Sequence, residues 1–129
     1  MNMFENNAFF WQKLDTLFFS SKVVIDHPKD SYHKKYANLV YPVDYGYLSD
    51  TSVEEEKPMA IFKGSLASNF VSSIVVTADI LTKDCSVKLL VGCTPEEEQD
   101  ILFFLNQTEF QKTILMRRGK EVPDWAQND

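Results

Sequence analysis

Cysteine is scarce in this chain, which contains only Cys85 and Cys93. The two lack the CxxC spacing of zinc and redox motifs, and no histidine lies near them in the sequence. We expect both to be reduced, partly buried small side chains, although a disulfide between paired strands stays open. Neither a zinc site nor a disulfide framework is indicated.

Long apolar runs are also absent, and none approaches the length of a membrane-spanning helix. The N-terminal residues include Glu5 and no basic cluster ahead of the apolar ones, unlike a secretory signal. We therefore expect no membrane segment and a cytoplasmic location.

Positive charge is in deficit, because 13 Lys and Arg face 19 Asp and Glu, giving a net charge of -6. Affinity for the phosphate backbone of nucleic acids comes chiefly from clustered lysine and arginine, so a nucleic-acid partner is not expected. A small anionic ligand is not excluded. Divalent cations held by carboxylates let an acidic protein bind phosphates.

The 129 residues, 44% of them hydrophobic, suit a single domain over residues 1–129 with one proper core. Residues 7–19 predict an amphipathic helix with apolar side chains at helical spacing. These side chains are Phe10, Trp11, Leu14, Leu17 and Phe18. We expect this stripe to pack on the core, with a homo-oligomer contact through the aromatic helix as the alternative.

Short runs of β-branched residues predict strands at 23–26, 60–62, 72–81 and 87–91, with a hairpin turn over 82–86. A second helix is predicted from Thr94 to about residue 106 or 107, because Thr94, Pro95 and Glu97 form a capping box. Residues 113–116 suit a last strand or a helical turn. Residues 120–129 are expected to be an extended tail with Trp125 docked on the body or on a neighbour.

This order of elements predicts an α+β, mainly β fold. We expect a small closed or nearly closed five-stranded, OB-like β-barrel, flanked by an N-terminal and a C-terminal helix.

The sequence at residues 41–48 is Tyr-Pro-Val-Asp-Tyr-Gly-Tyr-Leu. On an extended strand, Tyr41, Tyr45 and Tyr47 share one face, since strand side chains repeat every second residue. Pro42 and Gly46 mark an edge, a bulge or a close approach to the backbone. A row of hydroxyls can hold phosphate oxygens or metal-bound water, whereas the simpler alternative is a half-buried strand with solvated hydroxyls.

This stretch resembles the Tyr-Pro-x-x-Tyr-Gly-Tyr signature of the soluble, family I inorganic pyrophosphatases. The likeness extends loosely from about residue 23 to 107, and residues 93–97 resemble a shortened bacterial branch of that family. Asp26 stands where the family has an acidic residue ending its first strand. Lys35 and Tyr36 match a Lys-Tyr pair, and Lys88 matches a later phosphate-site lysine.

The resemblance implies hydrolysis of pyrophosphate or a related phosphoanhydride with Mg²⁺ or Mn²⁺. By the same likeness Asp26 and Asp84 are expected metal ligands, and Glu55, from an acidic loop that departs from the family pattern, is expected as a third in place of a missing aspartate. Lys35, Tyr45 and Lys88 are the expected substrate-binding residues, with Tyr45 and Asp84 as catalytic residues.

The chain departs from the family's metal-binding pattern at several positions. Ala60 stands where the family has its central metal-binding aspartate, and Ser86 replaces the second aspartate of a later pair. The Tyr-Lys pair of the family's C-terminal helix falls near Asn106 and Gln107. Because phosphoanhydride hydrolysis needs metal ions in fixed geometry, we expect slow or impaired turnover. The alternative is a non-catalytic member of the fold that binds a phosphorylated ligand or a protein partner.

Overall fold

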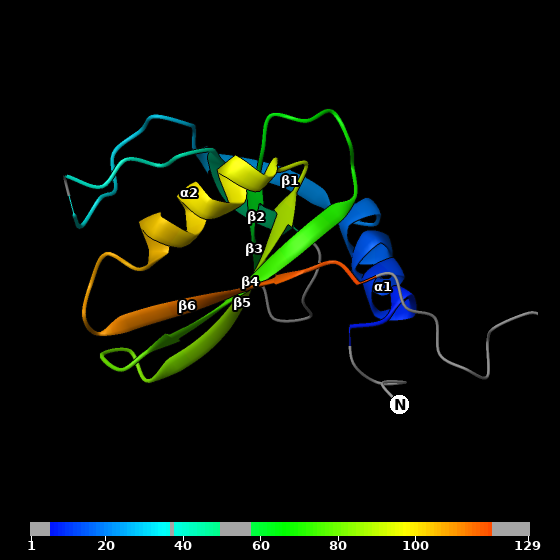
Figure 1. Ribbon diagram of the computed structural model, residues 1–129. Helices are drawn as coiled ribbons and strands as arrows, with labels where there is room; N and C mark the ends of the chain where they lie inside the picture. The colour runs from blue at the N-terminus through cyan, green and yellow to red at the C-terminus, as the bar shows by residue number, and fades with distance from the viewer. Residues whose placement is uncertain (1–5, 37, 50–57, 120–129) are drawn as a thin grey trace, which may run out of the picture.

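The computed structural model describes residues 6–36, 38–49 and 58–119, and Glu55 and the 120–129 tail lie outside them. In chain order the elements are α1 (Ala8–Phe19), β1 (Lys22–His27), β2 (Asp44–Ser49), β3 (Met59–Lys63), β4 (Val71–Asp79), β5 (Asp84–Val91), α2 (Pro95–Leu105) and β6 (Gln111–Arg117) (Figure 1). Within these residues, no helix is long and apolar enough to cross a membrane.

The six strands form one sheet in the order β1-β2-β3-β5-β4-β6. Neighbours are antiparallel except β3 and β5, which are parallel over four residue pairs. The sheet is thus two antiparallel halves, β1-β2-β3 and β5-β4-β6, joined along β3 and β5. The α+β, mainly β class is confirmed. The strands do not close into the expected barrel. In the described sheet, β1 and β6 are the two edge strands, and each pairs with only one neighbouring strand.

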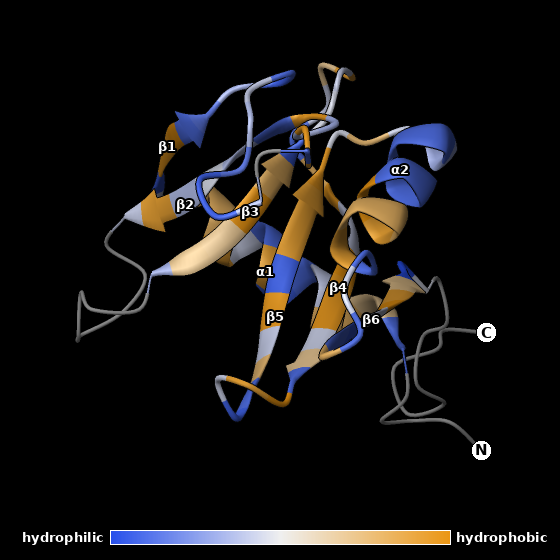
Figure 2. Cartoon of the chain, turned by 90° about the vertical axis from the view of Figure 1, so that its left-hand side faces the viewer, coloured by the Kyte–Doolittle hydropathy of each residue, from blue (hydrophilic) through white to orange (hydrophobic). Residues whose placement is uncertain are grey.

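The sheet is covered by α1 on one face and by α2 on the other (Figure 2). Side chains that alternate along a strand enter opposite faces, so Ile61 and Leu89 pack with α1 while Phe62 and Leu90 pack with α2. The cluster on the α1 face contains Trp11, Phe18, Leu48, Ile61, Val71, Ile74, Leu89 and Val91. The cluster on the α2 face contains Tyr41, Val43, Phe62, Val75, Leu90, Cys93, Ile101 and Leu105. Burial on both faces explains why apolar residues are consecutive at 74–76 in β4 and at 89–91 in β5.

Helix α1 begins at the cap Asn7, whose side chain accepts hydrogen bonds from the backbone of the first turn. Trp11 and Phe18 are buried in the core, whereas Phe10 remains half exposed. A two-pronged ion pair joins this helix to the residue after β6. The guanidinium of Arg118 donates to the carboxylate of Asp15 at 3.0 and 2.8 Å. This ion pair therefore joins helix α1 to the C-terminal end of strand β6.

Only part of the tyrosine-rich stretch at residues 41–48 lies in the sheet, because β2 begins at Asp44. Tyr41 lies in the preceding connection and does not belong to the strand. Gly46 pairs with Ile25 of β1, and a Cβ at this glycine would overlap the carbonyl oxygen of Val24. The close approach to the backbone predicted for this glycine is confirmed.

Helix α2 begins with the predicted capping box, in which the Thr94 and Glu97 side chains each accept a backbone N–H from the other residue. Its buried Glu98 accepts hydrogen bonds from Ser73 of β4 at 2.7 Å and from Arg117 of β6 at 2.9 Å. The residues after α2 form a strand, β6, which decides between the two alternatives left by the sequence. These contacts hold α2 over β4 and β6.

A candidate ligand-binding cleft

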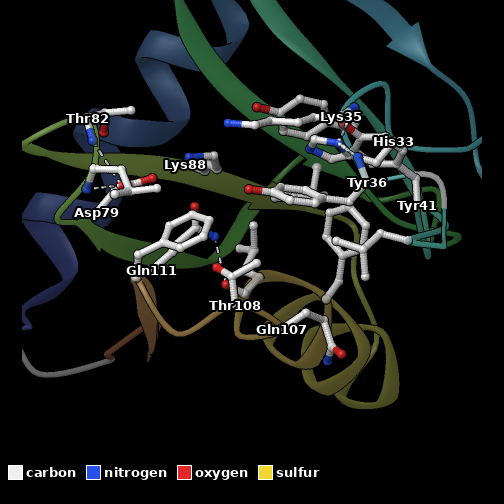
Figure 3. Close-up of a pocket in the computed structure, with 17 residues that line it drawn as sticks. His33, Lys35, Tyr36, Tyr41, Asp79, Thr82, Lys88, Gln107, Thr108 and Gln111 are labelled. Atoms are coloured by element: carbon white, nitrogen blue, oxygen red, sulfur yellow. Dashed lines mark hydrogen bonds between the residues drawn. The ribbon is translucent and has the colours of Figure 1, made fainter.

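A cleft of about 250 Å³ lies on the α2 face of the sheet. It is bounded by the connection between β1 and β2, by the floor of the sheet, and by the end of α2 with its link to β6 (Figure 3). The residues that line it are His33, Lys35, Tyr36, Leu39, Tyr41, Tyr45, Phe62, Asp79, Leu81, Thr82, Lys88, Phe104, Leu105, Gln107, Thr108, Phe110 and Gln111.

The strand register gives the floor of the cleft two ends of opposite charge. Lys88 of β5 is paired with Val75 of β4 and with Ala60 of β3. Four residues further along β4, Asp79 is paired with Asp84 of β5. We call the Lys88 region the basic end and the Asp79 region the acidic end. They are about 13 Å apart along the strand, because each residue adds about 3.3 Å.

At the basic end, Lys88 is a partly buried lysine on the sheet floor. Its Nζ donates to Ser86 Oγ at 3.2 Å, and it takes part in none of the ion pairs found among the described residues. Burial lowers the pKa of Lys88, and the charge of Asp84 opposes that shift. A bound anion would favour the charged ammonium group still more.

The connection of residues 28–43 brings Lys35 to the same end of the cleft. Nδ1 of His33 accepts the backbone N–H groups of Lys35 at 3.0 Å and of Tyr36 at 3.2 Å. Burial lowers the pKa of His33, and the nearby His27 and Lys35 lower it further, which favours the neutral ring that such bonds need. The Lys35 ammonium lies 5.6 Å from the centre of the Tyr36 ring. His33 therefore holds two cleft residues in place.

Tyr41 and Tyr45 remain neighbours although only one of them is in a strand. Their rings stack with centres 5.3 Å apart, and Tyr41 also contacts His27 at 4.7 Å and Phe104 of α2 at 4.8 Å. Burial raises the pKa of Tyr45 to about 12, with further contributions from Tyr41 and Asp26. The Tyr45 hydroxyl is thus protonated at neutral pH, and it can act as a hydrogen-bond donor but not as a base.

At the acidic end, one oxygen of Asp79 is fixed by the turn that follows β4. Its Oδ1 accepts the backbone N–H groups of Leu81 at 2.9 Å and of Thr82 at 3.1 Å. Gln111, opposite Asp79 on β6, donates its side-chain amide to the carbonyl of Leu105 at 2.7 Å. This end of the cleft consequently presents a carboxylate in a fixed orientation.

Of the residues proposed from the sequence, Lys35, Tyr45 and Lys88 line this one cleft. Asp26 and Asp84 are exposed and do not line it, and Asp26 instead contacts Nδ1 of the adjacent His27 at 3.0 Å. The negative charges of both carboxylates still affect cleft residues. The charge of Asp26 raises the pKa of Tyr45, and the charge of Asp84 raises the pKa of Lys88. Glu55 lies outside the described residues.

Sequence reasoning did not identify Asp79 or His33 as residues of the site. Asp79 ends an apolar strand and is followed by a turn, a position where a carboxylate commonly caps backbone N–H groups. Its place opposite Asp84 across the hairpin is evident only from the strand register of the structure. His33 is isolated in a polar segment, and nothing in the sequence indicates its two backbone partners.

In the described part of the chain, no three His, Cys, Asp or Glu side chains are grouped to hold a metal ion. Two carboxylate residues, Asp79 and Asp84, are directly paired in the strand register beside the cleft. Mg²⁺ can be bound through one or two carboxylates when waters and substrate phosphates supply its other ligands. The donor set thus fits a weakly held Mg²⁺ better than a full protein cage.

No family model matches the sequence, and no curated protein matches it. Among solved structures, the fold is similar to a crystal structure of an inorganic phosphatase from Anaplasma phagocytophilum, with a TM-score of 0.51. The two chains share a fold. The match covers 74% of this chain and 82% of the other, at 12% sequence identity. At that identity the likeness concerns the fold alone, and the activity of this chain is argued from its own cleft.

Proposed function

We propose that this protein binds a small phosphorylated ligand, such as pyrophosphate, at the basic end of the cleft. The observation that carries the proposal is Lys88, a partly buried cation with no carboxylate bound to it among the described residues. A buried charge is costly unless it is paired, and a phosphate would supply the missing opposite charge.

The groups around Lys88 suit the oxygens of a phosphate. Lys35 lines the same space and adds a second ammonium group, and the protonated hydroxyl of Tyr45 adds a neutral donor. In Figure 3, Lys35 and Tyr36 extend into the cleft from the β1–β2 connection, and Lys88 extends into it from β5. Two cations and one hydroxyl would bind a phosphate without any metal, in a protein whose net charge is negative.

Metal-dependent hydrolysis of pyrophosphate or a related phosphoanhydride is the second candidate. It is favoured by the pairing of Asp79 with Asp84 across the β4–β5 hairpin, and by the fold that this chain shares with an inorganic phosphatase. Bound Mg²⁺ or Mn²⁺ would supply an activated water and neutralise charge on the leaving phosphate. Asp84 with Asp79 would hold the ion, while Lys35, Tyr45 and Lys88 orient the phosphates.

Turnover by this route would be slow, because Ala60 lies beside Lys88 where a further carboxylate could have faced the phosphates. Asp26 and Glu55 remain proposed additional ligands, with Asp26 standing outside the cleft lining. A loosely held ion lowers the pKa of its water without fixing the attack geometry.

Calorimetric titration with pyrophosphate, first in EDTA and then with Mg²⁺, tests the binding proposal. Lys88→Met should weaken binding at least about tenfold, since hydrogen bonds to charged groups contribute about 1.5–3 kcal/mol. Lys112→Met is the matched control, because Lys112 is exposed on the α1 face of the sheet and should leave affinity unchanged. Absence of binding by the folded wild-type protein would overturn the proposal.

Phosphate release from pyrophosphate, measured on the same samples, tests the second candidate. Release should require Mg²⁺ or Mn²⁺ and should fall in both Asp79→Asn and Asp84→Asn. Binding with no release above a buffer blank would leave a phosphate-binding protein of this fold and remove the enzyme.

A further inference from the structure

The cleft is larger than a binding site for an inorganic anion needs to be, and its two ends differ in charge. Its basic end holds Lys35 and Lys88, whereas its acidic end holds Asp79. Pyrophosphate is anionic at both of its ends, so without a metal one end would face the carboxylate of Asp79. A ligand that satisfies both ends is negative on one side and carries neutral hydrogen-bond donors on the other.

Aromatic rings line the middle and the acidic end of the cleft. Tyr36, from the β1–β2 connection, and Phe110, from the link to β6, have ring centres 6.4 Å apart and are tilted by 38°. Both side chains are partly exposed at the cleft, as is that of Phe104. The backbone carbonyl of Phe110 accepts a hydrogen bond from the N–H of Ile80, which places residue 110 next to the turn after Asp79, and both residues line the cleft. A hydrated anion gains little from such rings, whereas a planar heterocycle can stack on them.

We propose that the ligand of this cleft is a mononucleotide. Its phosphate would lie at Lys35 and Lys88, and its base would lie against the rings of Tyr36 and Phe110. Donor groups of the ribose or the base would reach the carboxylate of Asp79. The cleft volume of about 250 Å³ lies just below the range of about 300–1,000 Å³ that is typical of ligand pockets, which favours a small ligand over a dinucleotide. This inference rests on the proposed phosphate-binding function and adds the class of compound.

Calorimetric titrations in EDTA compare AMP, GMP, CMP and UMP with ribose 5-phosphate and with pyrophosphate. At least one nucleotide should bind ten or more times as tightly as ribose 5-phosphate, as about 1.4 kcal/mol of added interaction would give. Phe110→Leu and, separately, Tyr36→Leu should remove most of that difference while leaving the affinity for ribose 5-phosphate unchanged. Phe103→Leu is the control, because Phe103 is on the exposed side of α2, outside the cleft.

The outcomes separate the two proposals. Pyrophosphate binding that depends on Lys88, with no nucleotide tighter than ribose 5-phosphate, would overturn the nucleotide inference and leave the proposed function standing. Failure of every compound to bind would overturn both. A nucleotide that binds tightly, and whose affinity is unchanged in both Phe110→Leu and Tyr36→Leu, would overturn the assignment of the base to these rings. Circular dichroism of each variant establishes that it is folded.

Discussion

Nδ1 of His33 lies 3.0 Å from the backbone nitrogen of Lys35 and accepts its hydrogen bond. The same ring nitrogen accepts the N–H of Tyr36, so one histidine fixes the turn that carries a cation and an aromatic ring into the cleft. Nδ1 can accept these bonds only while it carries no proton. The cleft therefore contains a group whose protonation state sets the position of its neighbours.

Phosphate binding should weaken in mild acid for this reason. Burial lowers the pKa of His33 below its usual 6.5, so the ring is neutral above that pH and the turn is intact. As the pH falls below 6.5 and through the lowered pKa, protonation removes both bonds. Stability contributed by the neutral ring is present above pH 6.5 and is lost over the same interval.

Pyrophosphate titrations between pH 8 and 5, with an NMR titration of the His33 ring, measure this effect. Protonation of the ligand also changes affinity, so His33→Ala provides the reference. The variant should bind more weakly at neutral pH and follow the ligand's own titration only. Identical pH profiles for the wild type and His33→Ala would show that the ring does not control the site.

Ala60→Asp should weaken phosphate binding when no metal is present. Ala60 and Lys88 are directly paired on neighbouring strands, whose backbones lie about 4.8 Å apart. A carboxylate there would pair with Lys88 and compete with the ligand, lowering affinity about tenfold. Ala60→Asn has nearly the same size without the charge and should have a smaller effect. Equal affinities for wild type and Ala60→Asp in EDTA would argue that Lys88 does not contact phosphate.

Asp15→Asn should destabilise the protein without changing ligand affinity. The substitution removes the charge that pairs with Arg118, while the amide oxygen can still accept the N–H of Val71. Loss of a partly buried, two-pronged pair should cost about 2 kcal/mol. In a chain of this length that lowers the melting temperature by about 6 °C. Asp100→Asn, on the exposed side of α2, is the control, and equal melting temperatures of the two variants would contradict the expectation.

Local signals in the sequence predicted the helices and most strands. The box of Thr94 and Glu97 fixed the start of α2, because its two hydrogen bonds join residues only three apart. Gly46 signalled a close backbone approach, which depends on the size of its own side chain. The α+β, mainly β class followed from the order of such elements.

Features that depend on distant pairing could not be predicted in the same way. The sheet is open and not a barrel because β6, and not β1, pairs with the second edge of β4. Likewise, no residue near Ala60 specifies its partner Lys88. Lys35, Tyr45 and Lys88 were proposed from a family resemblance, and the fold brings them to one cleft. Asp79 was missed because its role depends on the strand opposite it.

The four residue pairs that join β3 to β5 also determine the dimensions of the cleft. Tyr45 belongs to one half of the sheet and Lys88 to the other, and this short parallel ladder is the strand pairing that joins the two halves. A slip of one residue would move β5 by about 3.3 Å and turn Lys88 to the opposite face. Neither half alone contains a complete binding site. Any ligand that contacts both would act as an additional crosslink and slow the separation of the halves during unfolding.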